Sequence, residues 1–272
     1  MTDRVKLSDG ELRELAAVAE ELADAAGTAI LPYFRTPMSV DNKLAGIGFD
    51  PVTEADRAAE KIIRACITAR FPAHGILGEE FGHARGTSAL TWVIDPIDGT
   101  RAFMCGMAQW GTLVALNDGE RPVLGLLDQP FMQERWLGFG GTTSFRSRQG
   151  KKIIRTRACS ALTDAILTTT SPTGYFTDIE RSAFEGLAER ARLTRYGGDC
   201  YAYGLLALGH IDLTVEAGLK PWDIQALIPI IEGAGGIVTA WDGTDAARGG
   251  RVIACGDRVL HAAVVDLLRA ST

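Results

Sequence analysis

The chain has 272 residues, of which 46% are hydrophobic, and its formal net charge is −6. This length and apolar content suffice for one large domain or for two smaller layers around a continuous core. An acidic chain without a basic stripe lacks the signature of nucleic-acid binding. No apolar run reaches the roughly 18 residues of a membrane span, so no membrane partner is expected.

The N-terminal segment and the cysteines suggest a compartment. Residues 1–20 are charged and lack the apolar core of a signal peptide. The five cysteines are scattered, and no Cys-x-x-Cys pair occurs. An odd number of unpaired cysteines is typical of a reduced protein, in which thiols fill the core. We therefore expect a cytoplasmic location.

The first half of the chain predicts two helices and an antiparallel sheet. Ser8 and Glu11 form a capping box ahead of a long helix, and Thr53 and Asp56 open a second helix that closes at residues 71–72. An Asn-Asp-Gly turn at residues 117–119 predicts a hairpin. The strands expected in this half are residues 76–77, 92–94, 112–115, 123–127 and 136–139.

The second half alternates strands with helices. Strands are expected at residues 166–169, 213–215, 237–239 and 252–254, and helices at 182–192, 201–208, 222–232 and 259–268. The change of pattern near residues 145–155 predicts two halves, residues 1–150 and 151–272. Sheets covered by helices in stacked layers fit this order of elements.

Two carboxylates follow the apolar run at residues 92–94. Asp95 and Asp98 fall in a turn that ends in Gly99 and Thr100. Fixed carboxylates suit hard cations such as Mg²⁺, and backbone N–H groups at a helix start favour an anion such as phosphate. The pattern indicates phosphoryl chemistry, and an ordinary structural turn is the alternative.

Three further acidic clusters lie at the ends of expected elements. They are Glu54 with Asp56, Glu79 with Glu80, and Asp223. For each cluster alone, a helix cap or a solvated turn is the simpler explanation.

Several other catalytic motifs are missing. Asp95 and Asp98 are spaced by three residues, which disfavours the Asp-x-Asp-x-Thr phosphatases with a nucleophilic aspartate. The sequence contains no P-loop, no complete dinucleotide fingerprint and no Gly-x-Ser-x-Gly. The four histidines lack metal-ligand spacing. Any metal site would therefore be built from carboxylates.

Taken together, the motifs resemble the inositol monophosphatase superfamily of metal-dependent phosphatases. The matching segments are residues 50–56, 78–80, 92–100, 219–223 and 232–236, in the family order and at the family spacing. The resemblance implies the layered αβαβα sandwich, a small-molecule phosphate monoester as substrate and a homodimer. It also implies about two or three Mg²⁺ ions per active site, which activate a water and stabilise the leaving oxygen.

The resemblance also implies roles for single residues. Metal ligands would be the carboxylates of Glu79, Asp95, Asp98, Asp223 and Asp56, with the backbone carbonyl of Ile97. Gly99 and Thr100 would hold the phosphate through their N–H groups. Thr100, assisted by Asp56, would orient the attacking water, and Glu79 completes the catalytic set. Residues 1–150 would thus carry most ligands, and residues 151–272 would supply Asp223 and the substrate pocket.

Asp199 and Glu216 fall on family positions that face the non-phosphate part of the substrate. Two carboxylates there favour a cationic group such as a protonated amine, because a buried unpaired charge is costly. Residues 198–203 and 216–221 also resemble the histidinol-phosphatase branch of the family. We therefore expect a histidinol-phosphate phosphatase of histidine biosynthesis. The structural alternatives are a helix N-cap for Asp199 and a solvated strand end for Glu216.

Two other functions stay open at this point. One is an inositol- or sugar-phosphate monoesterase, and the other is a non-catalytic interaction protein with the same fold. The glycine-rich residues 44–50 precede the Asp56 cluster. They are interpreted either as a mobile lid over the site or as an ordinary connection.

Overall fold

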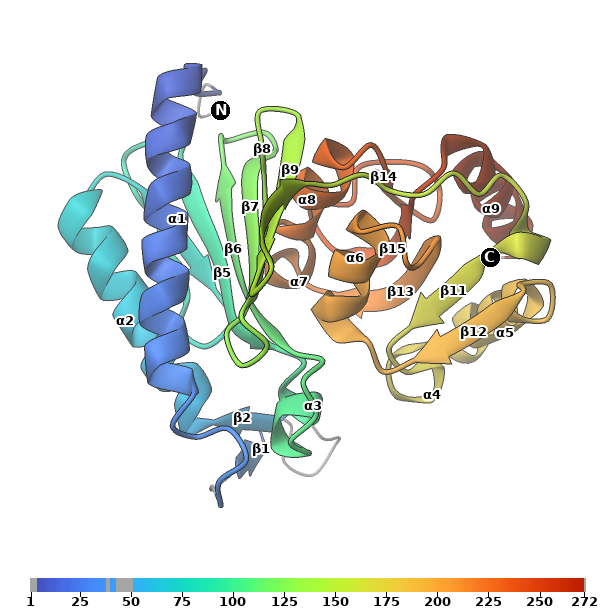
Figure 1. Ribbon diagram of the computed structural model, residues 1–272, viewed down its shortest axis with the longest axis horizontal. Coiled ribbons are helices and arrows are strands. Elements are labelled where there is room, and N and C mark those ends of the chain that lie inside the picture. The colour runs from blue at the N-terminus through green and yellow to red at the C-terminus, as the bar shows by residue number, and fades with distance from the viewer. Residues whose placement is uncertain (1–3, 38–39, 43–50, 272) are drawn as a thin grey trace.

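The computed structural model describes residues 4–37, 40–42 and 51–271, and stacks helices and sheets in alternating layers (Figure 1). Residues 44–50, interpreted either as a lid or as an ordinary connection, lie outside the described residues. None of the helices in the described ranges combines the length and the apolar character that a membrane span requires.

The larger sheet has eight strands among the described residues, in the order β10-β9-β8-β7-β6-β5-β3-β4. They are β3 (Gly75–Gly78), β4 (Gly82–Ala84), β5 (Thr91–Asp98), β6 (Gly111–Asn117), β7 (Pro122–Gln129), β8 (Glu134–Phe139), β9 (Thr142–Ser147) and β10 (Gly150–Ile153). The expected hairpin is confirmed as β6 and β7, which pair antiparallel. Only the pair β3–β5 is parallel within this described sheet.

The second sheet has five strands in the described part of the chain, in the order β12-β11-β13-β15-β14. They are β11 (Ile166–Thr169), β12 (Leu193–Tyr196), β13 (Leu213–Leu219), β14 (Ile237–Ala240) and β15 (Gly250–Cys255). A small antiparallel ribbon, β1 (Val40–Asn42) with β2 (Pro51–Thr53), stands apart from both sheets.

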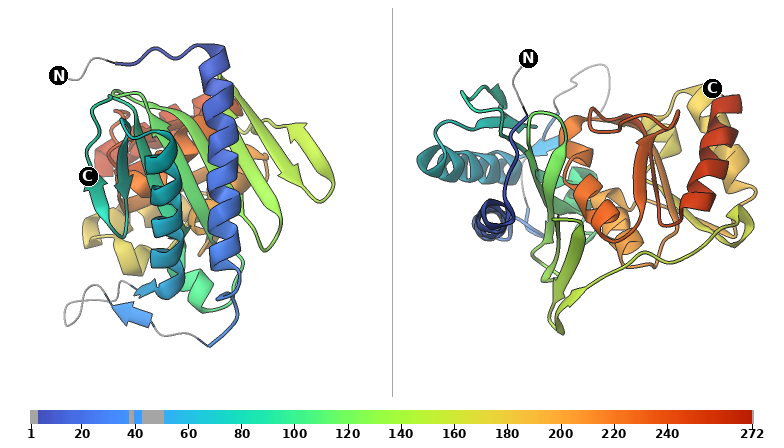
Figure 2. Two further views of the ribbon diagram at one scale, coloured as in Figure 1. Left: turned by 90° about the vertical axis from the view of Figure 1, so that its left-hand side faces the viewer. Right: turned by 90° about the horizontal axis from the view of Figure 1, so that it is seen from above.

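Helices cover the outer faces of both sheets and fill the space between them. Figure 2 shows α1 and α2 side by side on the larger sheet, while α6 and α8 lie between the sheets and α9 covers the far side. The helices are α1 (Asp9–Ile30), α2 (Glu54–Arg70), α3 (Thr100–Met104), α4 (Pro172–Tyr175), α5 (Asp178–Ala188), α6 (Asp199–Ala207), α7 (Pro221–Ile224), α8 (Leu227–Gly233) and α9 (Arg258–Ser271), with a 3₁₀ turn at Leu162–Asp164.

Buried apolar side chains form one cluster in each space between layers. Trp92 and Trp110 lie in the cluster under α1 and α2, Trp136 lies in the cluster between the sheets, and Trp241 lies in the cluster under α5 and α9. This arrangement confirms the αβαβα sandwich.

The larger sheet ends at β10 and the second begins at β11. A division into residues 1–150 and 151–272 stays a prediction.

Two expected helices are wrong in their bounds. The helix predicted at residues 222–232 is two helices, α7 and α8, because Pro229 has no N–H for the carbonyl of Gln225 and its ring would clash there. The helix predicted at residues 182–192 spans Asp178–Ala188 instead. It begins at a capping box of Thr177 and Glu180, which the apolar spacing alone did not indicate.

Candidate active site

A cavity of about 490 Å³ opens at the carboxyl end of β5 and is lined by residues from both halves of the chain. Nine of the residues singled out in the sequence line it. They are Glu79, Asp95, Ile97, Asp98, Gly99, Thr100, Asp199, Glu216 and Asp223. Asp56 lies behind this surface, where its carboxylate faces Thr100 and Glu79.

Three carboxylates meet at the base of the cavity. Asp95, Asp98 and Asp223 each contribute one oxygen to a group whose atoms all lie within 4.8 Å of one another. The two acids expected in a turn lie within β5 itself, where the pairing with β6 shifts register between Asp95 and Asp98. This irregularity lets two acids spaced by three residues reach the same cavity.

Backbone donors fix the orientation of these carboxylates. The N–H of Ile97 donates to Asp95 Oδ1 at 3.0 Å, and the N–H of Cys200 donates to Asp98 Oδ2 at 2.6 Å. Asp223 accepts from the N–H of Lys220 at 2.6 Å, so it caps α7 and belongs to the cluster at the same time. The capping alternative for Asp223 is therefore compatible with a role in the cavity.

Among the described residues, the carboxylates of the cluster repel one another, and Lys220 offsets only part of this repulsion at Asp223. Burial and the neighbouring acids, Glu79 among them, raise the pKa of Asp95 and Asp223 well above the ordinary range. Burial raises the pKa of Asp98 to about 6. Oxygen donors held this close favour a hard divalent cation, which would remove the repulsion. The donor set therefore fits Mg²⁺.

Asp56 and Thr100 form a polar pair beside this cluster. Asp56 is buried at the start of α2, where its Oδ2 accepts the N–H of Thr53 at 2.8 Å and also the Thr53 hydroxyl. Its other oxygen lies 3.5 Å from Thr100 Oγ1, which donates to the carbonyl of Ile97 at 3.0 Å. Burial raises the pKa of Asp56 to about 6.

Gly99 and Asp199 pack against each other at the N-terminus of α3. Gly99 has φ +86°, and a Cβ there would lie 2.8 Å from the Gln109 carbonyl and 3.1 Å from Asp199 Cβ. Glycine is therefore required at this position. Asp199 is the first residue of α6 rather than its N-cap, which is Gly198, and has φ +43°. Burial, Asp98 and Glu216 raise the pKa of Asp199 to about 8.

Glu216 is 3% exposed, which excludes the alternative of a solvated strand end. Its carboxylate accepts from the Thr170 N–H at 2.6 Å, the Thr170 hydroxyl at 2.8 Å and the Thr169 hydroxyl at 3.0 Å. Burial nevertheless raises its pKa to about 7. Glu216 is thus a fixed acid on the wall of the cavity opposite the larger sheet.

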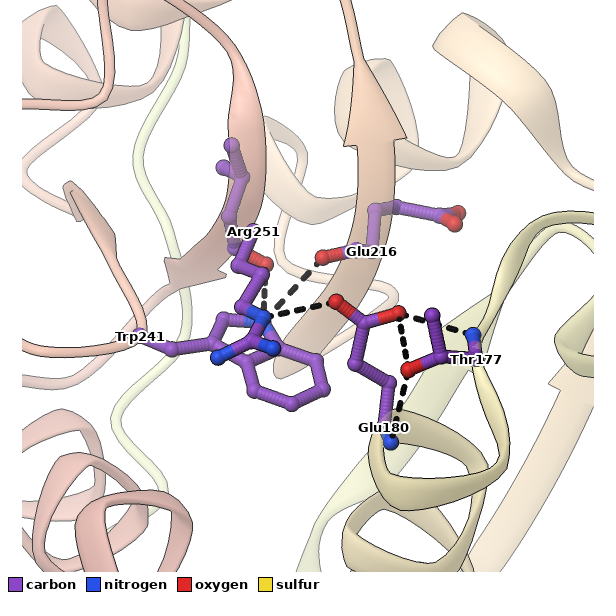
Figure 3. A network of polar contacts seen from close by, with 6 residues as sticks. Thr177, Glu180, Glu216, Trp241 and Arg251 are labelled. Carbon is purple, nitrogen blue, oxygen red and sulfur yellow. Dashed lines mark hydrogen bonds and ion pairs between the residues drawn. The ribbon is translucent and has the colours of Figure 1, made fainter. Parts of the chain in front are cut away.

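The main chain of Glu216 is held by Trp241 (Figure 3). The indole N–H donates to the carbonyls of Glu216 at 3.1 Å and Val252 at 3.2 Å, where the pairing of β13 with β15 becomes irregular after Glu216. Arg251 stacks on the Trp241 ring and pairs with Glu180 at 2.6 Å. In Figure 3 the Glu216 carboxylate extends away from Trp241, so the indole fixes its backbone only.

Comparisons with known proteins place this geometry in a family. A model described as the inositol monophosphatase family matches residues 11–272. The chain belongs to the inositol monophosphatase family. It is 42% identical to the chloroplastic bifunctional phosphatase IMPL2 of Arabidopsis thaliana, over 97% of this chain and 77% of that protein. It is 35% identical to a histidinol-phosphatase of Mycobacterium tuberculosis, over 81% of this chain and 85% of that protein.

Solved structures agree with this placement. An inositol monophosphatase from Zymomonas mobilis superposes with a TM-score of 0.84 at 44% identity, covering 94% of this chain and 98% of that one. A suhB protein from Bartonella henselae has a TM-score of 0.85 at 25% identity, covering 95% of this chain and 100% of that one. As a member of this family with histidinol-phosphatase relatives, the chain is a phosphoric monoester hydrolase that acts on small phosphate esters.

The cavity of this family member also contains residues that the sequence patterns missed. They are Arg101, Thr170, Gly174 and Tyr175, whereas the lining residues beyond these four and the nine above fall in the segments 198–203, 216–221 and 219–223 that the resemblance had marked. Arg101 directly follows the recognised motif, and its guanidinium lies 4.8 Å from the centre of the Tyr175 ring. The position of Arg101 after Thr100 could have drawn attention to it. Tyr175 carried no signal, because α4 is only four residues long and contains none of the recognised motifs.

Proposed function

We propose that the protein hydrolyses L-histidinol phosphate to L-histidinol and phosphate in histidine biosynthesis, with Mg²⁺ as its metal. The substrate assignment rests on the pair Asp199 and Glu216. Both line the cavity, and neither belongs to the three-carboxylate cluster. Their raised pKa values mean that ionisation is opposed until a cation arrives. A protonated amine on the substrate would supply that cation, whereas a neutral polyol would not.

The relatives support the same substrate class. Proteins named histidinol-phosphatase from Streptomyces coelicolor and Chlorobaculum parvum are 35% and 36% identical to this chain. Proteins named inositol monophosphatase, such as that of Mesembryanthemum crystallinum at 32% identity, support the alternative of an inositol phosphate. Arg101 also faces Asp199 and offsets part of its repulsion. The pKa of Asp199 is still raised to about 8 beside Arg101, so the choice between the two substrates rests on Asp199 and Glu216 together.

We assign the metal ligands to the oxygens at the base of the cavity. These are the carboxylates of Asp95, Asp98, Asp223 and Glu79 and the carbonyl of Ile97, with Asp56 beside a further ion. Held by these residues, Mg²⁺ would lower the pKa of a water and stabilise the charge on the leaving oxygen. Gly99 and Thr100 would direct their N–H groups at the phosphate.

Thr100 and Asp56 would orient the attacking water. The Thr100 hydroxyl donates to Ile97 or Asp56, which leaves its lone pairs free to accept a hydrogen bond from the water. The water oxygen forms a bond to phosphorus while the ester P–O bond breaks. A proton from the water passes towards the Asp56 carboxylate, which faces the Thr100 hydroxyl. The leaving oxygen takes up a proton from solvent water and is released as the hydroxyl of the alcohol, and Asp56 returns its proton to solvent.

The test compares phosphate release from L-histidinol phosphate and from myo-inositol 1-phosphate, with Mg²⁺ and with chelator. We expect a strong preference for histidinol phosphate. Asp199→Asn and Glu216→Gln should lower kcat/KM for histidinol phosphate by at least about tenfold more than for the neutral ester, since charged hydrogen bonds contribute about 1.5–3 kcal/mol. The exposed acid Asp178 gives the control variant Asp178→Asn. Equal losses on both substrates would reject the cation pocket.

The homodimer and the cytoplasmic location belong to the same proposal. Support for a reducing compartment comes from the five cysteines, all of which are free thiols. Light scattering of the purified protein measures the mass in solution, for which we expect twice the 29.1 kDa of one chain. A monomer at micromolar concentration would reject the dimer without affecting the catalytic assignment.

A further inference from the structure

Glu60 is a buried acid that does not reach the cavity. It lies on α2, its side chain is 0% exposed, and Arg64 pairs with it at 2.7 Å one helical turn later. Burying a carboxylate is costly unless its oxygens are paired and hydrogen-bonded. Arg64 binds only one of the two carboxylate oxygens. The other partners of Glu60 therefore indicate the role of this acid.

Those partners are backbone groups of the hairpin tip that carries Glu79. The tip joins β3 to β4, whose pairing ends at Gly78 and Gly82. Glu60 Oε2 accepts the N–H of Glu80 at 2.7 Å, and Oε1 accepts the N–H of Phe81 at 3.1 Å. One buried carboxylate therefore binds the two residues that directly follow Glu79.

Two further contacts complete this arrangement. Arg64, held by Glu60, also donates to the carbonyl of Gly82 on the far side of the tip. Gly78, on the near side, has no side chain at the place where Glu60 approaches. A Cβ on Gly78 would lie 2.1 Å from Glu60 Oε1, so glycine is needed for the contact. The tip is thus bound from α2 on both sides of Glu79.

We propose that Glu60 is a positioning residue that holds Glu79 at the metal site. The inference rests on the metal ligands of the proposed function. Glu79 is the only one of the proposed carboxylate ligands that stands on a hairpin tip, while Asp95 and Asp98 are in β5 and Asp56 and Asp223 are in helices. A tip without an anchor would let the Glu79 carboxylate move, and a ligand that moves binds its metal more weakly.

The experiment measures Mg²⁺ binding without substrate, by isothermal titration calorimetry, on the full chain. Glu60→Gln keeps the size of the side chain but places an NH₂ group against a backbone N–H and removes the charge opposite Arg64. We expect its Mg²⁺ dissociation constant to rise by about tenfold or more, in line with the loss of a group that orients a metal ligand. Its kcat at saturating Mg²⁺ should stay close to that of the wild type.

Asp212→Asn is the matched control. Asp212 is 1% exposed, accepts the Ile166 N–H at 2.8 Å and pairs with Arg157 at 2.5 Å, but it does not line the cavity. It should lower Tm to a similar extent and leave the Mg²⁺ dissociation constant unchanged. Gly78→Ala perturbs the same contact from the other side and should weaken Mg²⁺ binding as Glu60→Gln does.

The outcomes separate this inference from the proposed metal site. Wild-type affinity in a folded Glu60→Gln protein would overturn the inference, and so would equal weakening in Asp212→Asn. If Glu60→Gln does not fold, Gly78→Ala decides in the same way. A wild-type protein that binds no Mg²⁺ would instead overturn the metal site itself.

Discussion

The two walls of the cavity are built differently. On the larger sheet, Asp95 and Asp98 come from one strand, and their carboxylates accept the backbone N–H groups of Ile97 and Cys200. On the second sheet, Glu216 accepts three hydrogen bonds from Thr169, at the end of the neighbouring strand β11, and from Thr170, which follows it. The first wall holds acids that repel one another until a cation binds. The second wall holds an acid whose position is fixed by hydrogen bonds but whose ionisation is still opposed by burial, which suits recognition of a cationic group on the substrate.

The largest expected effect is on the first wall. Asp98→Asn removes one oxygen charge from the three-carboxylate cluster while keeping the side-chain shape. We expect phosphate release to fall at least about 10³-fold, since a catalytic metal supplies several kcal/mol and each tenfold change corresponds to about 1.36 kcal/mol. Steady-state kinetics over a range of Mg²⁺ concentrations measures the loss. Full activity would refute the metal assignment.

The same variant should not destabilise the metal-free protein. The pKa of Asp98 is raised to about 6, so at neutral pH its charge destabilises the folded state relative to the unfolded state. Replacing it by a neutral amide should leave Tm in chelator equal to the wild-type value or higher. A large fall in Tm would mean that the loss of activity reflects folding and not metal binding.

The second prediction concerns how the free energy of unfolding changes with pH, and which ligand restores the stability lost from each wall. The pKa values of Asp56, Glu216 and Asp199 are raised to about 6, 7 and 8, above the ordinary values near 4. A raised pKa gives stability that is complete below the ordinary value and is lost as pH rises through the folded value. The free energy of unfolding in chelator should therefore fall by several kcal/mol between about pH 5 and pH 8.5, at about 1.4 kcal/mol per unit of pKa difference.

Urea unfolding at several pH values measures this loss. Mg²⁺ should restore the part of the lost stability that comes from the acids of the metal site. L-histidinol with Mg²⁺ should restore part of the remainder, because its amine pairs with Asp199 and Glu216. Asp199→Asn should flatten the curve above pH 7. Acids whose pKa is lowered, such as Asp118 and Glu180, act below about pH 4 and leave this window unaffected. Stability that rises with pH across the window would contradict the prediction.

The contrast between the walls also explains what the sequence could predict. Asp95 and Asp98 are three residues apart behind an apolar strand, so local spacing was enough to indicate a metal site. The layered fold followed from the order of the elements and the family motifs. Asp199 and Glu216 lie on α6 and β13, and only the resemblance brought them together. The break between α7 and α8 could have been predicted from Pro229, but apolar spacing concealed it.

Some contacts carried no local signal at all. Trp241 and Glu216 are 25 residues apart, and their hydrogen bond depends on an irregular pairing between β13 and β15. Glu60 and the tip that follows Glu79 are 20 residues apart and lie on different elements. Such contacts form only once the layers are packed, so the spacing of residue types in the sequence does not indicate them.

The smallest expected effect concerns Trp241, which binds the main chain of Glu216. Trp241→Phe keeps an aromatic ring under α5 but removes the N–H that binds the carbonyls of Glu216 and Val252. The loss of about 1 kcal/mol typical of one hydrogen bond should raise KM for histidinol phosphate about fivefold, with kcat little changed. KM for a neutral ester should not change, because Glu216 is the part of the site that the indole holds.

Trp110→Phe controls for the loss of a buried indole. Trp110 is 0% exposed in the cluster under α1 and α2, and its indole N–H has no hydrogen-bond partner among the described residues. It should lower Tm through lost packing but leave both KM values as in the wild type. If Trp241→Phe and Trp110→Phe shift KM alike, the second wall is not held by the indole, and Thr169 and Thr170 alone fix Glu216.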